Sequence, residues 1–206
     1  MSIVVICLIV GYAIGCMQVA YIIGRVFGKI DIREHGSGNA GSTNVTRVLG
    51  RKAGLIVFTL DILKGVIAFL VGQYVLSYGE PNIILGLYAG LGAVIGHNFP
   101  FYLKFRGGKG IATTIGVMIC FNPVMAFAIY GICVIVVAVT KYISAASLVM
   151  TLLFPLGMYF LDYYVEAVAV AIVLTVLSYY QHRGNIKRIL SGTERKFSFS
   201  KKGTLG

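Results

Sequence analysis

The 206-residue chain is too apolar and too weakly charged to be an ordinary soluble domain. Its residues are 58% hydrophobic and 12% charged, and the formal net charge is +11. A soluble domain carries about 25% charged residues. Half of that proportion, together with long unbroken apolar runs, indicates that lipid is the main solvent. No room remains for a large soluble domain, and we expect one integral membrane domain over residues 1–206.

Apolar runs of membrane-spanning length follow one another along the chain. Five of them are Ile3–Ile23, Gly54–Tyr78, Ile83–Leu103, Ile143–Leu161 and Val165–Tyr180. No basic segment precedes Ile3–Ile23, so we interpret it as a retained helix and not as a cleaved signal. The residues at 79–82, Gly-Glu-Pro-Asn, predict a turn between the second and third runs.

The apolar stretch Ile111–Thr140 is too long for one comfortable span, and Asn122-Pro123 interrupts its middle. A helix over Ile111–Phe121 alone would be about 16 Å long at 1.5 Å per residue, which is short of the ~30 Å hydrocarbon core. Two helices in this stretch make seven crossings in all. We therefore predict an all-α, polytopic membrane helix bundle of about seven transmembrane helices, with the fourth short or partly re-entrant.

The distribution of the basic residues also favours seven crossings. With the N-terminus outside, every Lys and Arg except Lys64, which lies inside a span, falls on the cytoplasmic side. A single span over Ile111–Thr140 would instead put the basic tail outside. The charge is therefore mainly a topology signal that also attracts anionic lipid, and we expect no nucleic-acid partner.

The four cysteines, Cys7, Cys16, Cys120 and Cys133, all lie inside apolar runs. None has a spacing that is typical of metal ligands, so we expect buried small side chains. We predict no metal site and no cofactor.

The first polar segment is Gly36–Arg47, GSGNAGSTNVTR. Its small residues allow tight turns in which adjacent amide N–H groups form a concave anion site. Ser37 adds a hydroxyl, and Arg47 adds a planar guanidinium suited to phosphate. A flexible polar loop with Asn and Gly turns is the alternative interpretation. The further residues predicted to bind phosphate here are Gly38, Asn39, Gly41, Ser42, Thr43 and Asn44.

The second polar segment is Gly96–Thr114, GHNFPFYLKFRGGKGIATT. Its glycines run directly into an apolar helix, so the amides at the helix start would face an anion, with Lys109 and Arg106 beside it. The frame is not that of a Walker P-loop. The predicted phosphate-binding residues are Arg106, Gly107, Gly108 and Gly110. His97 can act as a base or hydrogen-bond between helices.

The third segment, His182–Phe197, follows the last span. His182, Asn185 and Arg188 recur at three-residue steps, so a helical continuation puts them on neighbouring faces. Residues 191–194 then predict a turn. The alternative is an ordinary basic juxtamembrane tail.

One ionisable pair lies within the second span. Asp61 and Lys64 are three residues apart and can pair on one helix face. A structural ion pair and a direct role in the site are both open.

Four motifs, in their order along the chain, resemble those of the bacterial glycerol-3-phosphate acyltransferases that use acyl phosphate as donor. They are GSGNAGSTN, LDILKG at Leu60–Gly65, GHNFPFYLKFRGGKGIAT and HRGNIKRILSGTE. The resemblance covers most of the chain, and the one departure is at Tyr102 and Leu103.

The resemblance implies transfer of a fatty acyl group from acyl phosphate to the 1-hydroxyl of sn-glycerol 3-phosphate, giving lysophosphatidic acid and phosphate in an early step of phospholipid synthesis. It further implies a multi-pass protein of the bacterial cell membrane with its active site on the cytoplasmic side. The proton acceptor is His97, His182 or the substrate phosphate, and a Ser37 acyl-enzyme is less favoured. The expected catalytic residues are Ser37, Arg47, His97, Lys109, His182 and Asn185.

A membrane transporter of a phosphorylated solute is the alternative function. The short, Pro-ended fourth helix with Arg47 and Lys109 would suit a broken-helix anion site. The spans contain no visible internal repeat, and we favour the enzyme.

Overall fold

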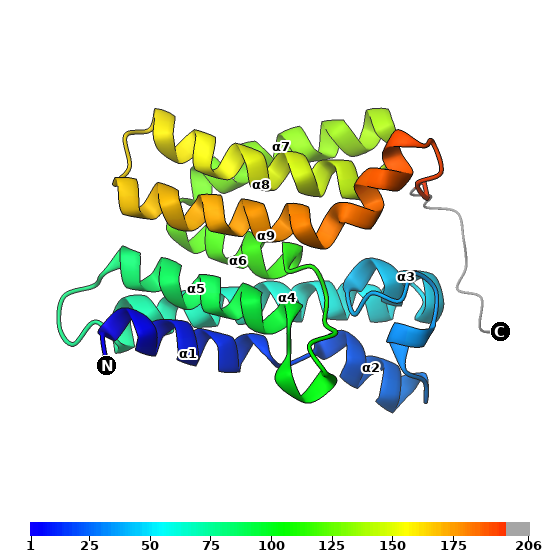
Figure 1. Ribbon diagram of the computed structural model, residues 1–206, viewed down its shortest axis with the longest axis horizontal. Helices are drawn as coiled ribbons and strands as arrows, with labels where there is room; N and C mark the ends of the chain where they lie inside the picture. The colour runs from blue at the N-terminus through cyan, green and yellow to red at the C-terminus, as the bar shows by residue number, and fades with distance from the viewer. Residues whose placement is uncertain (197–206) are drawn as a thin grey trace. The chain divides into compact units, whose positions relative to one another are not determined.

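The computed structural model describes residues 1–196, and helices are the only regular secondary structure in this range (Figure 1). Six segments are long and apolar enough to cross a membrane, and α6 is a shorter apolar helix of 11 residues. The predicted all-α membrane fold is confirmed. The helices are α1 (Ile3–Gly15), α2 (Val19–Phe27), η1 (Ile32–Glu34), α3 (Ser42–Leu49), α4 (Arg51–Leu70), η2 (Val71–Val75), α5 (Ile83–Asn98), η3 (Phe101–Leu103), α6 (Ile111–Phe121), α7 (Pro123–Thr140), α8 (Ile143–Phe160) and α9 (Val165–Leu190).

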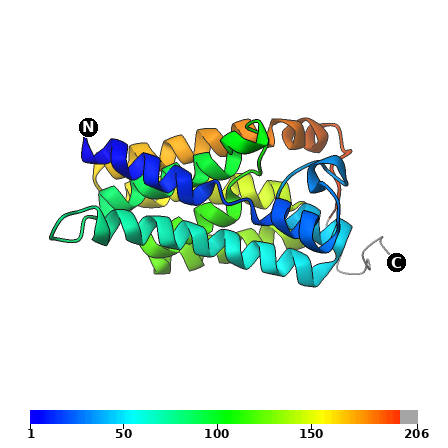
Figure 2. The same ribbon diagram turned by 90° about the horizontal axis from the view of Figure 1, so that it is seen from below.

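The first span is not one continuous helix, so the prediction for Ile3–Ile23 is wrong in this detail. The chain leaves the helix after Gly15 and re-enters it at Val19, and Figure 2 shows the link between α1 and α2. Exposed backbone groups inside a membrane protein need polar partners. Lys64 Nζ supplies one by donating to the Met17 carbonyl at 3.0 Å. The break therefore depends on a residue of α4 that no local pattern in the first span reveals.

Both predicted interruptions further along the chain are confirmed. Helix α6 ends at Phe121, and the Asn122 side chain caps α7 by accepting a hydrogen bond from the Met125 amide. Pro123 opens α7, where its missing N–H costs nothing. The turn at residues 79–82 ends at Asn82, which caps α5.

The chain forms two compact units. In the N-terminal unit (Met1–Val117), α1 and α4 both lie against α5, and α2 and α3 pack on α4 (Figure 1). In the C-terminal unit, which begins at Met118, α8 packs against both α7 and α9. The expectation of one functional domain over the whole chain stays a prediction.

Helices α1 and α5 approach each other closely because glycines line their contact. A Cβ atom at any of these positions would collide with the backbone of the opposite helix, which is the packing that small residues permit between membrane helices. The glycines are Gly11 and Gly15 on α1 and Gly92 and Gly96 on α5. Tyr12 Oη adds a hydrogen bond of 2.8 Å to the Phe99 carbonyl. The C-terminal end of α5, which leads into the second polar segment, is thereby held in place.

We expect Gly92→Ala to lower the thermal stability of the protein in detergent, since the new methyl group would meet the Leu8 carbonyl. Overpacking of this kind costs about 1–3 kcal/mol. Gly131→Ala on α7 is the matched control, because nothing lies within 4 Å of the added atom and alanine favours a helix. Thermal unfolding followed by circular dichroism compares the two. A Gly92→Ala midpoint at or above that of the wild type would contradict the close contact.

Candidate functional site

The first glycine-rich segment (residues 36–47) begins with a loop that the side chain of Asn44, at the start of α3, holds by hydrogen bonds to its backbone. Asn44 Nδ2 donates to the carbonyls of Ile32 and His35 at 3.0 and 2.9 Å, and Oδ1 accepts from the Ser37 amide at 2.8 Å. Gly36 has φ +64° and leaves no room for a Cβ beside Asn44. The Asn44 side chain is buried and therefore shapes the loop through backbone contacts.

The loop leads into the N-terminus of α3. Ser37 is exposed, whereas Ser42 and Thr43 are half-buried in the first turn of the helix. Gly41 is extended and caps the helix without a side chain, so first-turn amides can hydrogen-bond an anion. Arg47 lies in the last turn of α3 and is half-buried.

The second glycine-rich segment (residues 96–114) folds back on the end of α5. The Gly108 amide donates to the His97 carbonyl at 3.0 Å, and the Gly107 amide donates to the Asn98 carbonyl at 3.2 Å. Arg106 is exposed, while Lys109 is half-buried between two buried glycines. Gly110, with φ +75°, turns the chain directly into α6.

Gly108 brings the two glycine-rich segments together. A Cβ there would collide with His97 Nε2 and would lie 2.7 Å from the Ala40 carbonyl oxygen. No residue larger than glycine fits between these groups. The loop that carries Ser37 and the turn that carries Lys109 are therefore neighbours in the N-terminal unit.

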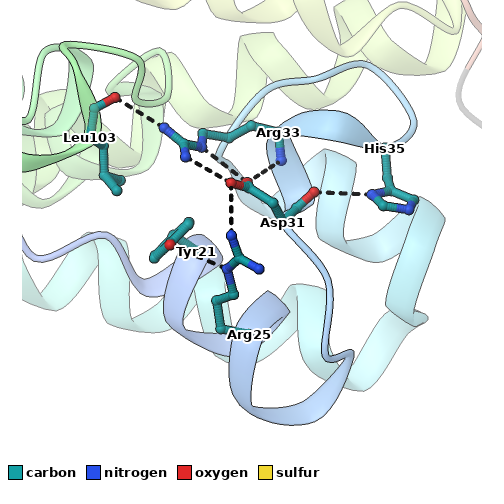
Figure 3. Close-up of polar contacts among 6 residues, drawn as sticks. All are labelled: Tyr21, Arg25, Asp31, Arg33, His35 and Leu103. Carbon is teal, nitrogen blue, oxygen red and sulfur yellow. Dashed lines mark hydrogen bonds and ion pairs between the residues drawn. The ribbon is translucent and has the colours of Figure 1, made fainter.

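A second link between the segments is an arginine–carboxylate cluster (Figure 3). Arg33 binds the Asp31 carboxylate through Nε at 3.0 Å and Nη2 at 2.7 Å, and its Nη1 donates to the Leu103 carbonyl at 3.0 Å. Arg25 adds a longer contact of 3.3 Å to Asp31. Both guanidinium groups lie over the Tyr21 ring, at 5.1 and 5.3 Å from its centroid. The cluster ties the chain before the first segment to η3 in the second.

The charges in this cluster are strongly coupled. Hydrogen bonds from Arg33 lower the pKa of Asp31 to about 2, against partial burial, which acts in the opposite direction. The same hydrogen bonds raise the pKa of Arg33. The pair is therefore fully ionised at any physiological pH.

The predicted pairing of Asp61 with Lys64 is confirmed. Lys64 Nζ lies 2.7 Å from Asp61 Oδ1 and also 2.7 Å from His97 Nδ1. All three side chains are buried. The Gln18 side chain joins the group from the link between α1 and α2, donating to the His97 carbonyl at 2.8 Å.

The tail segment (residues 182–197) belongs to the C-terminal unit, and its last residue lies outside the described residues. Helix α9 continues to Leu190, and a turn follows at residues 191–192, as predicted. His182 is buried, and its Nδ1 donates to the Ser178 carbonyl at 2.8 Å. In a neutral imidazole, this arrangement leaves the lone pair on Nε2.

Glu194 holds the end of the tail against α8 and α9. Its carboxylate accepts hydrogen bonds from Asn185 at 2.6 Å and from Ser144 and Arg188 at 2.7 Å. Burial acts to raise the pKa of Glu194, but these hydrogen bonds outweigh it and the pKa lies below its usual value. Asn185 is thus oriented by a carboxylate nine residues further along the chain.

Sequence patterns missed several of these supporting residues. Asp31 and Arg33 lie just before the first glycine-rich segment, and nothing in their spacing indicates a contact with the second segment. Gln18 offered a clearer signal, because it is a lone amide inside an apolar run. A polar side chain in such a run usually faces a partner inside the bundle.

We predict that Asp31→Asn destabilises the protein by roughly 1.5–3 kcal/mol at neutral pH, the contribution typical of charge-assisted hydrogen bonds. The folded pKa of Asp31, about 2, lies below its ordinary value of 3.8. The stabilisation is therefore complete well above pH 3.8 and is lost as the pH falls toward 2. Unfolding measured between pH 8 and pH 3 should show a constant difference between variant and wild type that shrinks below about pH 4.

Glu34→Gln is the matched control for this prediction. Glu34 is exposed, and its substitution removes one negative charge, as Asp31→Asn does, at a position three residues away. Its stability should follow that of the wild type. Equal stability of Asp31→Asn and the wild type at pH 7 would show that the cluster does not hold the two segments.

Known proteins share this chain's sequence and fold over nearly its whole length. The family model of glycerol-3-phosphate acyltransferase matches residues 5–192. The glycerol-3-phosphate acyltransferase of Thermoanaerobacter pseudethanolicus is 46% identical over 188 residues, covering 91% of this chain and 92% of that protein. That of Clostridioides difficile is 42% identical over 194 residues, covering 94% and 95%.

Solved structures agree with these matches. The crystal structure of PlsY, an integral membrane glycerol 3-phosphate acyltransferase, in its glycerol 3-phosphate form has a TM-score of 0.86 and 35% identity, covering 95% of this chain and 96% of that one. Its lysophosphatidic acid form gives a TM-score of 0.84 at the same identity. The resemblance of the four motifs is confirmed, and an acyltransferase replaces the alternative of a transporter. With the motifs, the helical membrane fold and these relatives in agreement, the chain belongs to the glycerol-3-phosphate acyltransferase family of integral membrane enzymes.

Proposed function

We propose that this acyltransferase moves a fatty acyl group from acyl phosphate to the 1-hydroxyl of sn-glycerol 3-phosphate, releasing lysophosphatidic acid and phosphate. The observation that carries the proposal is the contact of Gly108 with His97 and the Ala40 carbonyl. It brings the two glycine-rich segments side by side, and we expect both to bind phosphate. Donor and acceptor in this reaction each carry a phosphate, so the enzyme must hold two anions together against their repulsion.

The residues of the two segments would meet this requirement. Lys109 and Arg47 supply positive charge, and Ser37 and the glycine amides supply hydrogen-bond donors. Acyl phosphate is a mixed anhydride with a good leaving group, so positioning and charge neutralisation are the main demands. The substrate oxygen attacks the acyl carbonyl carbon, the bond from that carbon to the phosphate oxygen breaks, and phosphate departs.

The hydroxyl proton needs an acceptor, and His182 suits this task better than His97. The Nδ1 hydrogen of His182 is bound by the Ser178 carbonyl, so in the neutral ring Nε2 is the basic nitrogen. His97 has Nδ1 occupied by Lys64, and its Nε2 faces Gly108. The substrate phosphate is the other acceptor. Asn185, one helical turn from His182, would orient a substrate oxygen with its amide.

Direct transfer without a covalent intermediate fits Ser37 best. Ser37 is exposed in a glycine-rich loop, and among the hydrogen bonds described for residues 1–196 none joins it to a histidine. A serine nucleophile needs such a base to be activated. Its hydroxyl is better suited to binding an oxyanion.

The donor is tested by supplying purified protein with labelled glycerol 3-phosphate and, separately, acyl phosphate, acyl-CoA or acyl carrier protein. We expect labelled lysophosphatidic acid with acyl phosphate and none with the other two donors. Turnover with acyl-CoA and none with acyl phosphate would refute the donor assignment.

Two lysine variants make this assay specific. Lys109→Ala should lower kcat/KM by about ten- to 150-fold, the loss expected from one charge-assisted hydrogen bond. Lys52→Ala, at an exposed position at the start of α4, should behave like the wild type. If Lys109→Ala also kept wild-type turnover, Lys109 would contribute only to topology.

We also propose that the protein is a multi-pass protein of the bacterial cell membrane with its site on the cytoplasmic face. The basic loops carry this assignment, because Lys and Arg favour the cytoplasmic side. Sealed vesicles of known orientation test it, since neither phosphorylated substrate crosses lipid readily. Inside-out vesicles should be active at once, and right-side-out vesicles only after permeabilisation. Full activity of intact right-side-out vesicles would reverse the orientation.

A further inference from the structure

Lys64 Nζ is buried among three groups: it forms an ion pair with one of them and hydrogen bonds with the other two. They are Asp61 Oδ1 at 2.7 Å, His97 Nδ1 at 2.7 Å and the Met17 carbonyl at 3.0 Å. An ammonium group can only donate, so His97 Nδ1 must accept. The His97 ring is therefore neutral and carries its hydrogen on Nε2.

His97 in turn contacts the turn that leads to Lys109. Its Nε2 faces Gly108, where no Cβ fits, and its carbonyl accepts the Gly108 amide at 3.0 Å. Gln18 Nε2 donates to the same carbonyl. A continuous series of polar contacts thus runs from α4 through His97 to the turn at residues 107–109, called the glycine turn below.

We propose that Asp61 and Lys64 are positioning residues for substrate phosphate: they fix the orientation and hydrogen placement of His97, and His97 fixes the turn at residues 107–109. This inference rests on the proposed role of that turn in binding phosphate. Asp61 and Lys64 touch no reacting atom. Asp61 balances the charge of Lys64 and directs its Nζ, and Lys64 holds the imidazole.

The contact with His97 separates this role from that of a purely structural ion pair. Apolar residues of similar size can replace a buried pair without loss of stability, so stability alone does not require these charges. A structural pair would also need no particular form of His97. Asp61 and Lys64 are the charged groups described near the imidazole, and the Cys16 thiol, in the link between α1 and α2, acts on Lys64.

Steady-state kinetics of Asp61→Leu/Lys64→Met test the proposal. The double variant leaves no buried charge, so it should fold, with an unfolding midpoint lowered only by the loss of the hydrogen bond to the Met17 carbonyl. Because His97 loses its partner, the KM for glycerol 3-phosphate and the inhibition constant of inorganic phosphate should both rise at least about tenfold. Leu63→Met, on the exposed side of α4, is the control and should change neither constant. A folded double variant with wild-type constants would overturn the proposal.

The protonation state and tautomer of His97 can be measured in the wild-type protein. This test does not require any variant to fold. The chain has three histidines, so ¹⁵N-histidine labelling gives few signals, which His35→Gln and His182→Gln assign. We expect His97 to be the neutral form with hydrogen on Nε2, and its Nε2 signal to shift when inorganic phosphate is added. An Nδ1–H form, or an imidazolium, would overturn the proposal.

Lys64→Met alone provides a further comparison. It leaves the Asp61 carboxylate 3.6 Å from His97 Nδ1 without its cation, so the imidazole should gain a hydrogen on Nδ1. Retention of the wild-type form would show that Lys64 does not set it. These results distinguish this proposal from the proposed function. If phosphate does not inhibit the wild type, the proposed phosphate site is wrong. If phosphate inhibits normally but His97 is in a different protonation state, only the positioning role is rejected.

Discussion

The hydrogen bond from Lys64 to His97 joins the parts of the N-terminal unit that the site requires. Charged side chains in a membrane span are costly, by about 2.5–3.5 kcal/mol at a helix centre on insertion scales. Here the Lys64 ammonium pairs with the Asp61 carboxylate and donates to a backbone carbonyl of a broken helix. These contacts offset the free energy of burying the charges. The break between α1 and α2, the end of α5 and the glycine turn all share this one set of contacts. Loss of any one partner would leave the others buried and unsatisfied.

The Asp31 cluster holds the same segment through a second set of ion pairs and hydrogen bonds. Its core is the two-pronged hydrogen bonding of Arg33 to the Asp31 carboxylate, whose pKa is low, and both residues lie outside the membrane spans. One network acts from within the bundle on the turn before Lys109, and the other acts from the loop side on η3. The second glycine-rich segment is thereby held at both ends, although its own glycines favour mobility. Such a restrained loop can bind an anion with little loss of conformational entropy.

Glycine serves two separate purposes in this chain. Between α1 and α5 it permits close backbone contact between two apolar helices. At Gly108 it lets an imidazole and a carbonyl of another segment approach the backbone. The first use builds the membrane fold, and the second brings together loops that are far apart in the chain. An acyltransferase embedded in the membrane needs both, because it joins an apolar acyl chain to an acceptor that carries a phosphate.

The sequence by itself determined the all-helical membrane fold, the interruption at Asn122-Pro123, the Asp61–Lys64 pair and the position of the glycine-rich polar segments. Each follows from local properties: apolar length, proline, helical spacing or the density of small polar residues. Only the tertiary structure decided that α1 ends at Gly15, that Asn44 closes its own loop, and that His97 accepts from Lys64. These features depend on contacts between residues up to 47 positions apart, and spacing along one helix carries no information about the neighbour across an interface.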